Sequence, residues 1–203
     1  MNLKLRIASY WMPEILLKPE LDRVSEVTVK CLDQLLEKHA PKKSKYIINK
    51  DVKMEGTMEM RRKIMATAHN VRVKALIDSI GYDDALIVGR KALFKAGLKL
   101  GREAKNRLGV GNSPQDLIRA ARILYRVLGI DFKVEESGDK IAVTFEKCSL
   151  SNYYEPETCR ILSAADEGVV QGLNENISMK FIERMTEGRS ECVACLKQRN
   201  IIN

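Results

Sequence analysis

Apolar residues recur every three or four positions through most of the first 128 residues of the chain. This spacing is typical of amphipathic helices. It predicts four helices, over residues 19–36, 57–79, 83–102 and 114–128. Pro19 suits the first turn of the first helix, and Ser113 followed by Pro114 is a start signal for the fourth. The first part of the chain is therefore predicted to be mainly helical.

The third predicted helix carries three glycines, Gly89, Gly97 and Gly101. Each lowers helix stability by roughly 1 kcal/mol relative to alanine. Glycines at such positions indicate close approach by another helix or by a ligand. The sequence leaves these two explanations open.

After Gly129 the apolar residues alternate with polar ones, as they do in strands. The pattern predicts a hairpin, a helix and a second hairpin, over residues 130–145, 156–172 and 177–197. Helices come first along the chain and hairpins later. This order predicts an α+β fold, with a helical layer packed on an antiparallel sheet.

Two segments lie outside these patterns. Residues 1–17 are ambiguous, with a short strand predicted at 3–7 and an apolar anchor at Trp11. Residues 39–51 contain four lysines and are predicted to form a basic linker. The predicted division is an N-terminal helical extension with this linker, over residues 1–55, and the α+β domain, over residues 56–203.

The composition is that of an ordinary globular protein, with 45% hydrophobic and 31% charged residues. A net charge of +8 favours anionic partners. One basic stripe on the third helix is either a solvated face or an anion-binding surface, and it consists of Lys91, Lys95, Lys99 and Arg102. Only 5% of residues are aromatic, so stacking positions for single-stranded nucleic acid are scarce. A nucleic-acid-associated protein is therefore the third of three functional hypotheses.

The sequence gives no indication of a membrane segment. No apolar run approaches the roughly 20 residues that cross a bilayer. The N-terminus has basic residues but no small-residue cleavage site after them. These features predict a cytoplasmic protein without membrane association.

Four of the five cysteines lie late in the chain, at Cys148, Cys159, Cys192 and Cys195. In a chain without a secretion signal, such a group indicates metal binding, redox chemistry or a nucleophile more than disulfides. Cys148 follows a predicted strand, Cys159 lies near a helix start, and Cys192 opens the last strand. We expect these three to be neighbours in space, whereas Cys195 points to the opposite face of a regular strand. The alternative is a set of buried thiols without a ligand.

Thiolate ligands suit zinc, which takes sulfur, imidazole and carboxylate ligands in a tetrahedron. A fourth position would be open or filled from a set of three candidates, Asp166, Glu155 and His69. An iron–sulfur cluster has less support from the spacing. A second active role is nucleophilic, because a helix N-terminus would lower the pKa of Cys159.

Three features of the late sequence occur in a fixed order: a predicted strand that leads to Cys148, then Cys159 with Asp166 seven residues later, and finally the segment FIERMTEGRSECVACLK. This order resembles the L-2-amino-thiazoline-4-carboxylic acid hydrolase family. It is similar, more remotely, to the vinyl-4-reductase domain. The resemblance covers residues 60–197, and Met185 stands where an additional cysteine is frequent in the vinyl-reductase pattern.

The resemblance implies a vinyl-4-reductase-like α+β fold, a homodimer and a pocket for a small-molecule ligand or substrate. By position, Cys148, Cys159 and Cys192 match recurrent cysteines of the family, and Asp166 matches a recurrent acid. The predicted catalytic residues are Cys159 and Asp166, and the predicted metal ligands are Cys148, Cys159 and Cys192, with Cys195 as a weaker candidate. The implied activity is hydrolysis of a C–N bond in a small cyclic amidine or amide, as in opening of a thiazoline ring. The alternative is a non-catalytic ligand sensor in which zinc is structural.

Overall fold

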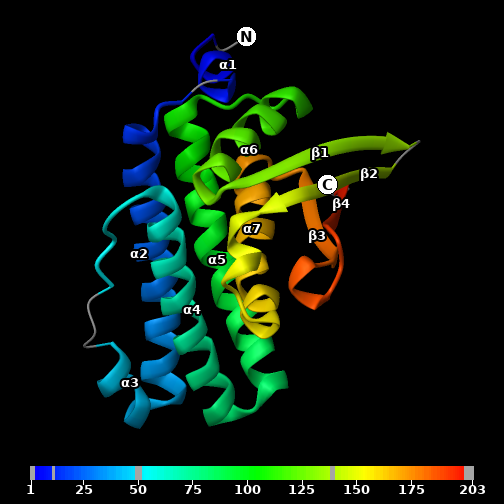
Figure 1. Cartoon of the computed structure of the whole chain (residues 1–203). Coiled ribbons are helices and arrows are strands. Elements are labelled where there is room, and N and C mark those ends of the chain that lie inside the picture. Colours follow the sequence, from blue (N-terminus) through cyan, green and yellow to red (C-terminus); the bar gives the residue numbers. More distant parts are fainter. Residues whose placement is uncertain (1–2, 11, 49–51, 138–139, 199–203) are drawn as a thin grey trace.

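The computed structural model describes residues 3–10, 12–48, 52–137 and 140–198. Long helices form the body of the molecule, and a sheet lies against α6 and α7 (Figure 1). The helices are α1 Leu3–Tyr10, α2 Glu14–His39, α3 Pro41–Ile47, α4 Met58–Ile80, α5 Tyr82–Leu108, α6 Pro114–Leu128 and α7 Pro156–Leu173. The strands are β1 Ile130–Ser137, β2 Lys140–Cys148, β3 Ile177–Glu183 and β4 Cys192–Gln198, and the single turns of 3-10 helix are η1 Ser149–Asn152 and η2 Met185–Glu187.

The predicted helix boundaries are confirmed where capping residues mark them. The side chain of Thr57 accepts a hydrogen bond from the backbone of Met60 at the start of α4, and Gly81 ends that helix. Ser113 caps α6 in the same way, with Pro114 in its first turn.

The predicted strand at residues 3–7 is wrong, because this segment forms helix α1. Its alternating sequence suggests a strand, but the buried residues are Leu5 and Ser9, four apart, while Ile7 is exposed. Leu5 packs into a core cluster with residues of α5 and α6. Burial of residues four apart against this cluster fits a helix and not a strand. Trp11 lies outside the described residues.

The predicted helix start at Pro19 is also wrong, since α2 begins five residues earlier and carries this proline inside it. The missing N–H leaves the carbonyl of Ile15 without its helical partner. Ile15 is exposed, so water can bond to that carbonyl. The predicted linker at 39–51 contains a short helix, α3, in which Pro41 takes the first position. Residues 49–51 are outside the described part of the chain.

The four strands form one antiparallel sheet in the order β1-β2-β4-β3. Its inner face packs on α6 and α7 through Tyr125, Phe132, Phe145 and Val170. Phe145 lies opposite Phe132 on one side and Cys192 on the other. The β1–β2 hairpin extends beyond the helices (Figure 1). The predicted α+β fold, a helical layer on an antiparallel sheet, is confirmed.

Helix α7 lies in backbone contact with α5. A Cβ atom at Gly97 or Gly101 would collide with carbonyl oxygens of α7. A Cβ atom at Gly168 or Gly172 would collide with carbonyl oxygens of α5. The glycines of α5 are therefore explained by a neighbouring helix and not by a ligand.

No described helix has the length and apolar composition that a membrane span requires.

We expect Gly97→Ala to lower the free energy of unfolding by about 1–3 kcal/mol, the usual cost of overpacking a core. The added methyl group meets the backbone of Ala165, which cannot move aside as a side chain can. The gain of roughly 1 kcal/mol in helix propensity is too small to offset this. Urea unfolding measures the change.

Gly89→Ala is the matched control on the same helix, because the three atoms nearest its methyl group all belong to the side chain of Ile161. We expect a smaller loss for this variant. Equal losses in the two variants would contradict the importance of the backbone contact.

Candidate functional site

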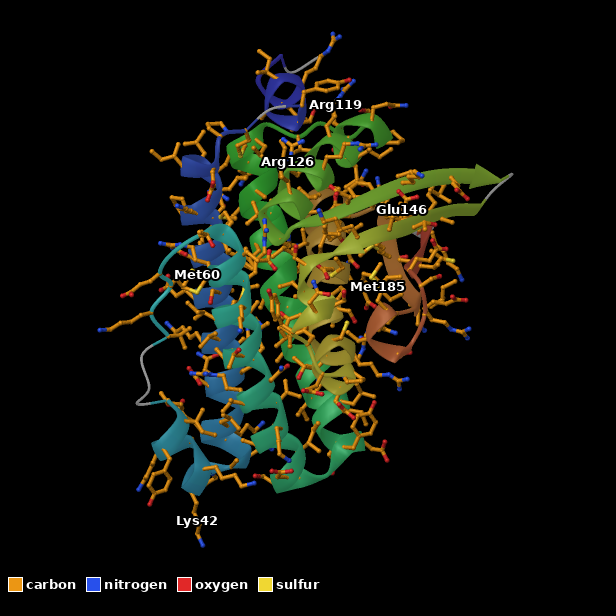
Figure 2. The ribbon with its side chains drawn as sticks, viewed as in Figure 1. Lys42, Met60, Arg119, Arg126, Glu146 and Met185 are labelled. Atoms are coloured by element: carbon orange, nitrogen blue, oxygen red, sulfur yellow. The ribbon has the colours of Figure 1, made fainter. Side chains whose placement is uncertain are left out.

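An apolar cavity lies between the helices and the inner face of the sheet, with a volume of about 80 Å³. Its wall is formed by helices α2, α4, α6 and α7, by strands β1 to β4, and by the segments that follow β2 and β3. Its apolar lining residues include Val24, Met65, Leu128, Ile130, Phe145, Leu150, Leu162 and Phe181. Arg184, just after β3, also lines it, and Met185, labelled in Figure 2, follows in η2. This site is enclosed mainly by hydrocarbon.

A second cavity of about 80 Å³ adjoins the first and extends between α2, α5, α6 and α7. Residues common to both walls are Val24, Thr28, Tyr125, Leu128, Ala165 and Asp166. The two volumes together are similar to the ~150 Å³ of an apolar cavity that admits benzene. The space therefore suits a compact ring rather than a long chain.

Asp166 is the carboxylate at the boundary between the two cavities. Among the described residues, its side chain takes part in none of the hydrogen bonds or ion pairs. Burial raises the pKa of this carboxyl from 3.8 to about 7, and the negative charge of Glu167 adds to the increase. Within the described part of the chain, Asp166 is thus an unpaired carboxyl in an apolar space.

The neighbouring Glu167 shows the opposite arrangement. Both of its oxygens accept hydrogen bonds from Arg90 Nη2 on α5, at 2.8 and 2.7 Å. One residue along α7 rotates the side chain by about 100°, so Glu167 faces α5 while Asp166 faces the cavity. The ion pair holds α7 in place, and it leaves Asp166 available for a ligand.

Three of the four late cysteines, Cys148, Cys159 and Cys192, line this same cavity together with Asp166. Cys195 lines neither cavity. It pairs with Ala142 and Lys180 across the sheet. The predicted meeting of the first three thiols is found, and the backbone of β4 separates Cys195 from them.

Burial raises the pKa of all three cavity thiols, to about 12 for Cys148 and about 11 for Cys159. The lowered pKa expected for Cys159 at a helix N-terminus is not found. Its backbone N–H already bonds to the carbonyl of Glu155, so it lies beyond the free N–H groups of the first turn. At neutral pH these side chains are thiols and not thiolates.

Across the described ranges, no three histidine, cysteine, aspartate or glutamate side chains lie close enough to hold one metal ion. Zinc requires its ligands to converge at about 2.0–2.3 Å from the ion. The present arrangement does not fit such an ion. Zinc or an iron–sulfur cluster at the late cysteines stays a prediction, and elemental analysis of the purified protein checks it.

The two other candidate ligands have different roles. His69 is fully buried, its Nε2 lies 2.8 Å from Thr28 Oγ1, and its Nδ1 lies 2.8 Å from Tyr154 Oη. Burial, with a contribution from the positive charge of Arg72, lowers the pKa of His69 to about 3. Both ring nitrogens are engaged, so this histidine is a neutral structural group. Glu155 is exposed and lies just before α7.

Arg184 is a cavity residue that the sequence pattern did not identify. Alternation along β3 places Phe181 inward and even-numbered residues outward. A register shift between Phe181 and Glu183 interrupts the alternation, and Arg184 then lines the cavity. A β-bulge of this kind has no reliable signature in one sequence.

Comparison with known proteins supports the resemblance stated above. Residues 61–196 match the family model described as L-2-amino-thiazoline-4-carboxylic acid hydrolase. No curated protein matches the chain.

Two solved structures share the fold. One is a trafficking protein particle complex subunit 3 from Naegleria fowleri, covalently bound to palmitic acid, with a TM-score of 0.55 and 14% identity. That match covers 70% of this chain and 97% of the other. The second is the phenol-responsive sensory domain of the transcription activator PoxR with phenol, with a TM-score of 0.50 and 16% identity. It covers 66% of this chain and 74% of the other. At such identities the likeness concerns the fold alone.

We expect Asp166→Asn to stabilise the ligand-free protein at pH 8, by up to about 4 kcal/mol. The pKa of this carboxyl is raised in the folded state, so its neutral form favours folding. Wild-type stability from this group is therefore present below pH 4 and is lost as pH rises to about 7. Urea unfolding of both proteins at pH 5 and pH 8 measures the difference.

His69 also makes the stability of the wild type depend on pH, with the opposite sign. Its lowered pKa makes stability fall as pH drops from 6.5 to about 3. The difference in unfolding free energy between variant and wild type therefore isolates the contribution of Asp166. Glu157→Gln is the control, since Glu157 is an exposed carboxylate on the same helix. A gain for Asp166→Asn that is independent of pH would contradict the prediction.

Proposed function

Because the chain belongs to the L-2-amino-thiazoline-4-carboxylic acid hydrolase family, we propose that its cavity binds a small cyclic amidine and opens the ring with water. One observation carries the proposal: the Asp166 carboxyl lines an apolar cavity and has no hydrogen-bond or ion-pair partner among the described residues. Burying such a group is unfavourable unless a hydrogen-bond partner meets it. A ligand that donates hydrogen bonds supplies that partner.

An amidine suits this carboxyl for a geometric reason. Its two nitrogen atoms present parallel N–H groups, which a carboxylate accepts in a bidentate pair. The remaining ring atoms are apolar and suit the lining of Phe145, Leu162 and Phe181. The cavity volume limits the size of the ligand to that of a compact ring.

The pKa of about 7 also suits Asp166 for proton transfer near neutral pH. In the proposed step, the oxygen of water bonds to the amidine carbon and one proton of that water passes to Asp166. The ring C–N bond at that carbon then breaks, and Asp166 returns the proton to the departing ring nitrogen. The net change is addition of one water molecule. The neutral thiols favour this route over direct attack by cysteine.

A second candidate function is ligand sensing without turnover. The fold shared with a phenol-responsive sensory domain supports it, since phenol is a compact ring that donates a hydrogen bond. The site would be the same in both functions. They differ in whether the bound ring is opened, and mass spectrometry of the incubated ligand decides between them. A homodimer and a cytoplasmic location stay predictions.

We expect wild-type protein to bind 2-amino-2-thiazoline-4-carboxylate and Asp166→Asn to bind it at least about tenfold more weakly. The reason is the loss of a charge-assisted pair of hydrogen bonds, each charged bond contributing about 1.5–3 kcal/mol. Wild-type affinity should also weaken as pH falls below about 7, because the carboxyl becomes protonated. Titration calorimetry measures both effects.

Glu157→Gln again serves as the control, because it removes one charge from α7 outside the cavity. We expect it to bind like the wild type. If wild type and Asp166→Asn bind with equal affinity, or if neither binds, the proposed function is wrong.

We expect Cys159→Ser to retain ring-opening activity within about tenfold, whereas Asp166→Asn loses at least about a hundredfold, as removal of an acid–base group does. Quantification of the opened product by mass spectrometry measures both. The reverse order of losses would assign the chemistry to the Cys159 sulfur.

A further inference from the structure

A groove with a volume of about 540 Å³ lies between α1, α6 and β1. Among the described residues, Ile130 is the one that lines both this groove and the apolar cavity, so the two are separate spaces. Sites for small molecules typically measure about 300–1,000 Å³. Three arginines of α6 line the groove, and two of them, Arg119 and Arg126, are labelled in Figure 2 near the end of the molecule that carries α1. The proposed ring opening makes no use of these charges.

The third arginine is Arg122, and all three share one face of α6. Their spacings of three, four and seven residues place them within about 60° of each other around the helix, over about 10 Å of its axis. Arg126 Nη2 donates a hydrogen bond to the carbonyl of Ser9 at 2.9 Å. The guanidinium of Arg122 lies over the ring of Phe132, at 5.3 Å from its centroid. Contacts with α1 and β1 therefore hold two of the guanidiniums at the groove.

The charges in this groove do not cancel. Arg119 Nη1 pairs with the carboxylate of Asp116 at 3.1 Å. Across the ranges that the structure describes, neither Arg122 nor Arg126 forms an ion pair with a carboxylate, and Asp131 is the one carboxylate in the wall of the groove. Two guanidiniums are therefore available to an anionic ligand.

Asp131 reaches the groove because β1 is irregular at this point. On a regular strand, neighbouring residues point to opposite faces of the sheet. The register of β1 against β2 shifts between Asp131 and Phe132, and both residues line the groove. Such a bulge changes the direction of a side chain. The result is a carboxylate in the same groove as the arginines, where it accepts hydrogen bonds and donates none.

We propose that the groove binds a small phosphomonoester that carries hydroxyl groups, as a sugar phosphate does. The phosphate lies on Arg122 and Arg126, and the hydroxyls donate hydrogen bonds to Asp131. A phosphomonoester has a charge of about −1.5 to −2 at pH 7 and three acceptor oxygens, which matches two guanidiniums. The planar guanidinium fork fits phosphate oxygens in bidentate fashion. The groove is larger than a phosphate ion, and Asp131 repels anions, so the rest of the ligand has to be a hydrogen-bond donor.

The test compares ribose 5-phosphate, ribose and inorganic phosphate by titration calorimetry on the full chain. Low ionic strength is used, because salt screens exposed charges. We expect ribose 5-phosphate to bind about ten- to a hundredfold more tightly than ribose, the usual value of a charged hydrogen-bonded contact. Inorganic phosphate should bind more weakly than ribose 5-phosphate, because it faces Asp131 without hydroxyl donors. This comparison needs no variant.

The variant arm begins with Arg122→Met, which keeps an apolar side chain on Phe132 and removes the charge. We expect it to bind ribose 5-phosphate at least about tenfold more weakly than the wild type. Arg189→Met is the matched control, because Arg189 is 65% exposed and lies outside the groove. The control should bind as the wild type does.

Asp131→Asn gives an effect of the opposite sign. Removing this negative charge should tighten the binding of inorganic phosphate and reduce the advantage of ribose 5-phosphate over it. An affinity for inorganic phosphate that is unchanged or weaker in Asp131→Asn overturns the role of this carboxylate.

Two further results overturn the phosphate site itself. One is equal binding, or no binding, of ribose 5-phosphate and ribose by the wild type. The other is an equal affinity for ribose 5-phosphate in Arg122→Met and Arg189→Met. A single-stranded oligonucleotide that binds through Arg122 where ribose 5-phosphate does not would assign the groove to nucleic acid instead.

Discussion

The structure depends on the backbone contact between α5 and α7. Glycines on both helices, Gly97 and Gly101 facing Gly168 and Gly172, let the two helices approach without intervening side chains. The ion pair between Arg90 and Glu167 adds a directional contact to the same interface. Because α7 is held so closely on one side, its other face has a fixed relation to the sheet. That face lines the cavity.

The second constraint is electrostatic. Two adjacent carboxylates on α7 have opposite environments: Glu167 is paired with an arginine, and Asp166 faces hydrocarbon without a partner. Leaving Asp166 unpaired lowers the stability of the ligand-free protein. Natural proteins tolerate such costs where a group serves binding or catalysis. The same reasoning applies to Arg184 Nε, a buried donor without a partner among the residues that the structure describes.

The cysteines have a different significance from the one their spacing suggested. Cys148, Cys159 and Cys192 do meet in one space, and the family match covers all three. They meet there as neutral thiols, because burial disfavours the thiolate. Their clearest role in the described structure is to form part of an apolar wall. In the proposed function, the acid–base chemistry belongs to Asp166, which lines the same cavity.

The sequence by itself determined the order of helices and hairpins, the start of a helix near residue 57, the cap at Ser113, and the late segment whose cysteines line the cavity. These features follow from local periodicity and from short-range hydrogen bonds, which one sequence contains. Only the tertiary structure decided three other features: the helical conformation of residues 3–7, the inward position of Arg184 after a register shift, and the pKa of Asp166. Each depends on groups distant in the chain: the cluster around Leu5, the pairing of β3 with β4, and the hydrocarbon around α7. Burial and register are properties of the assembled fold, and a linear pattern does not contain them.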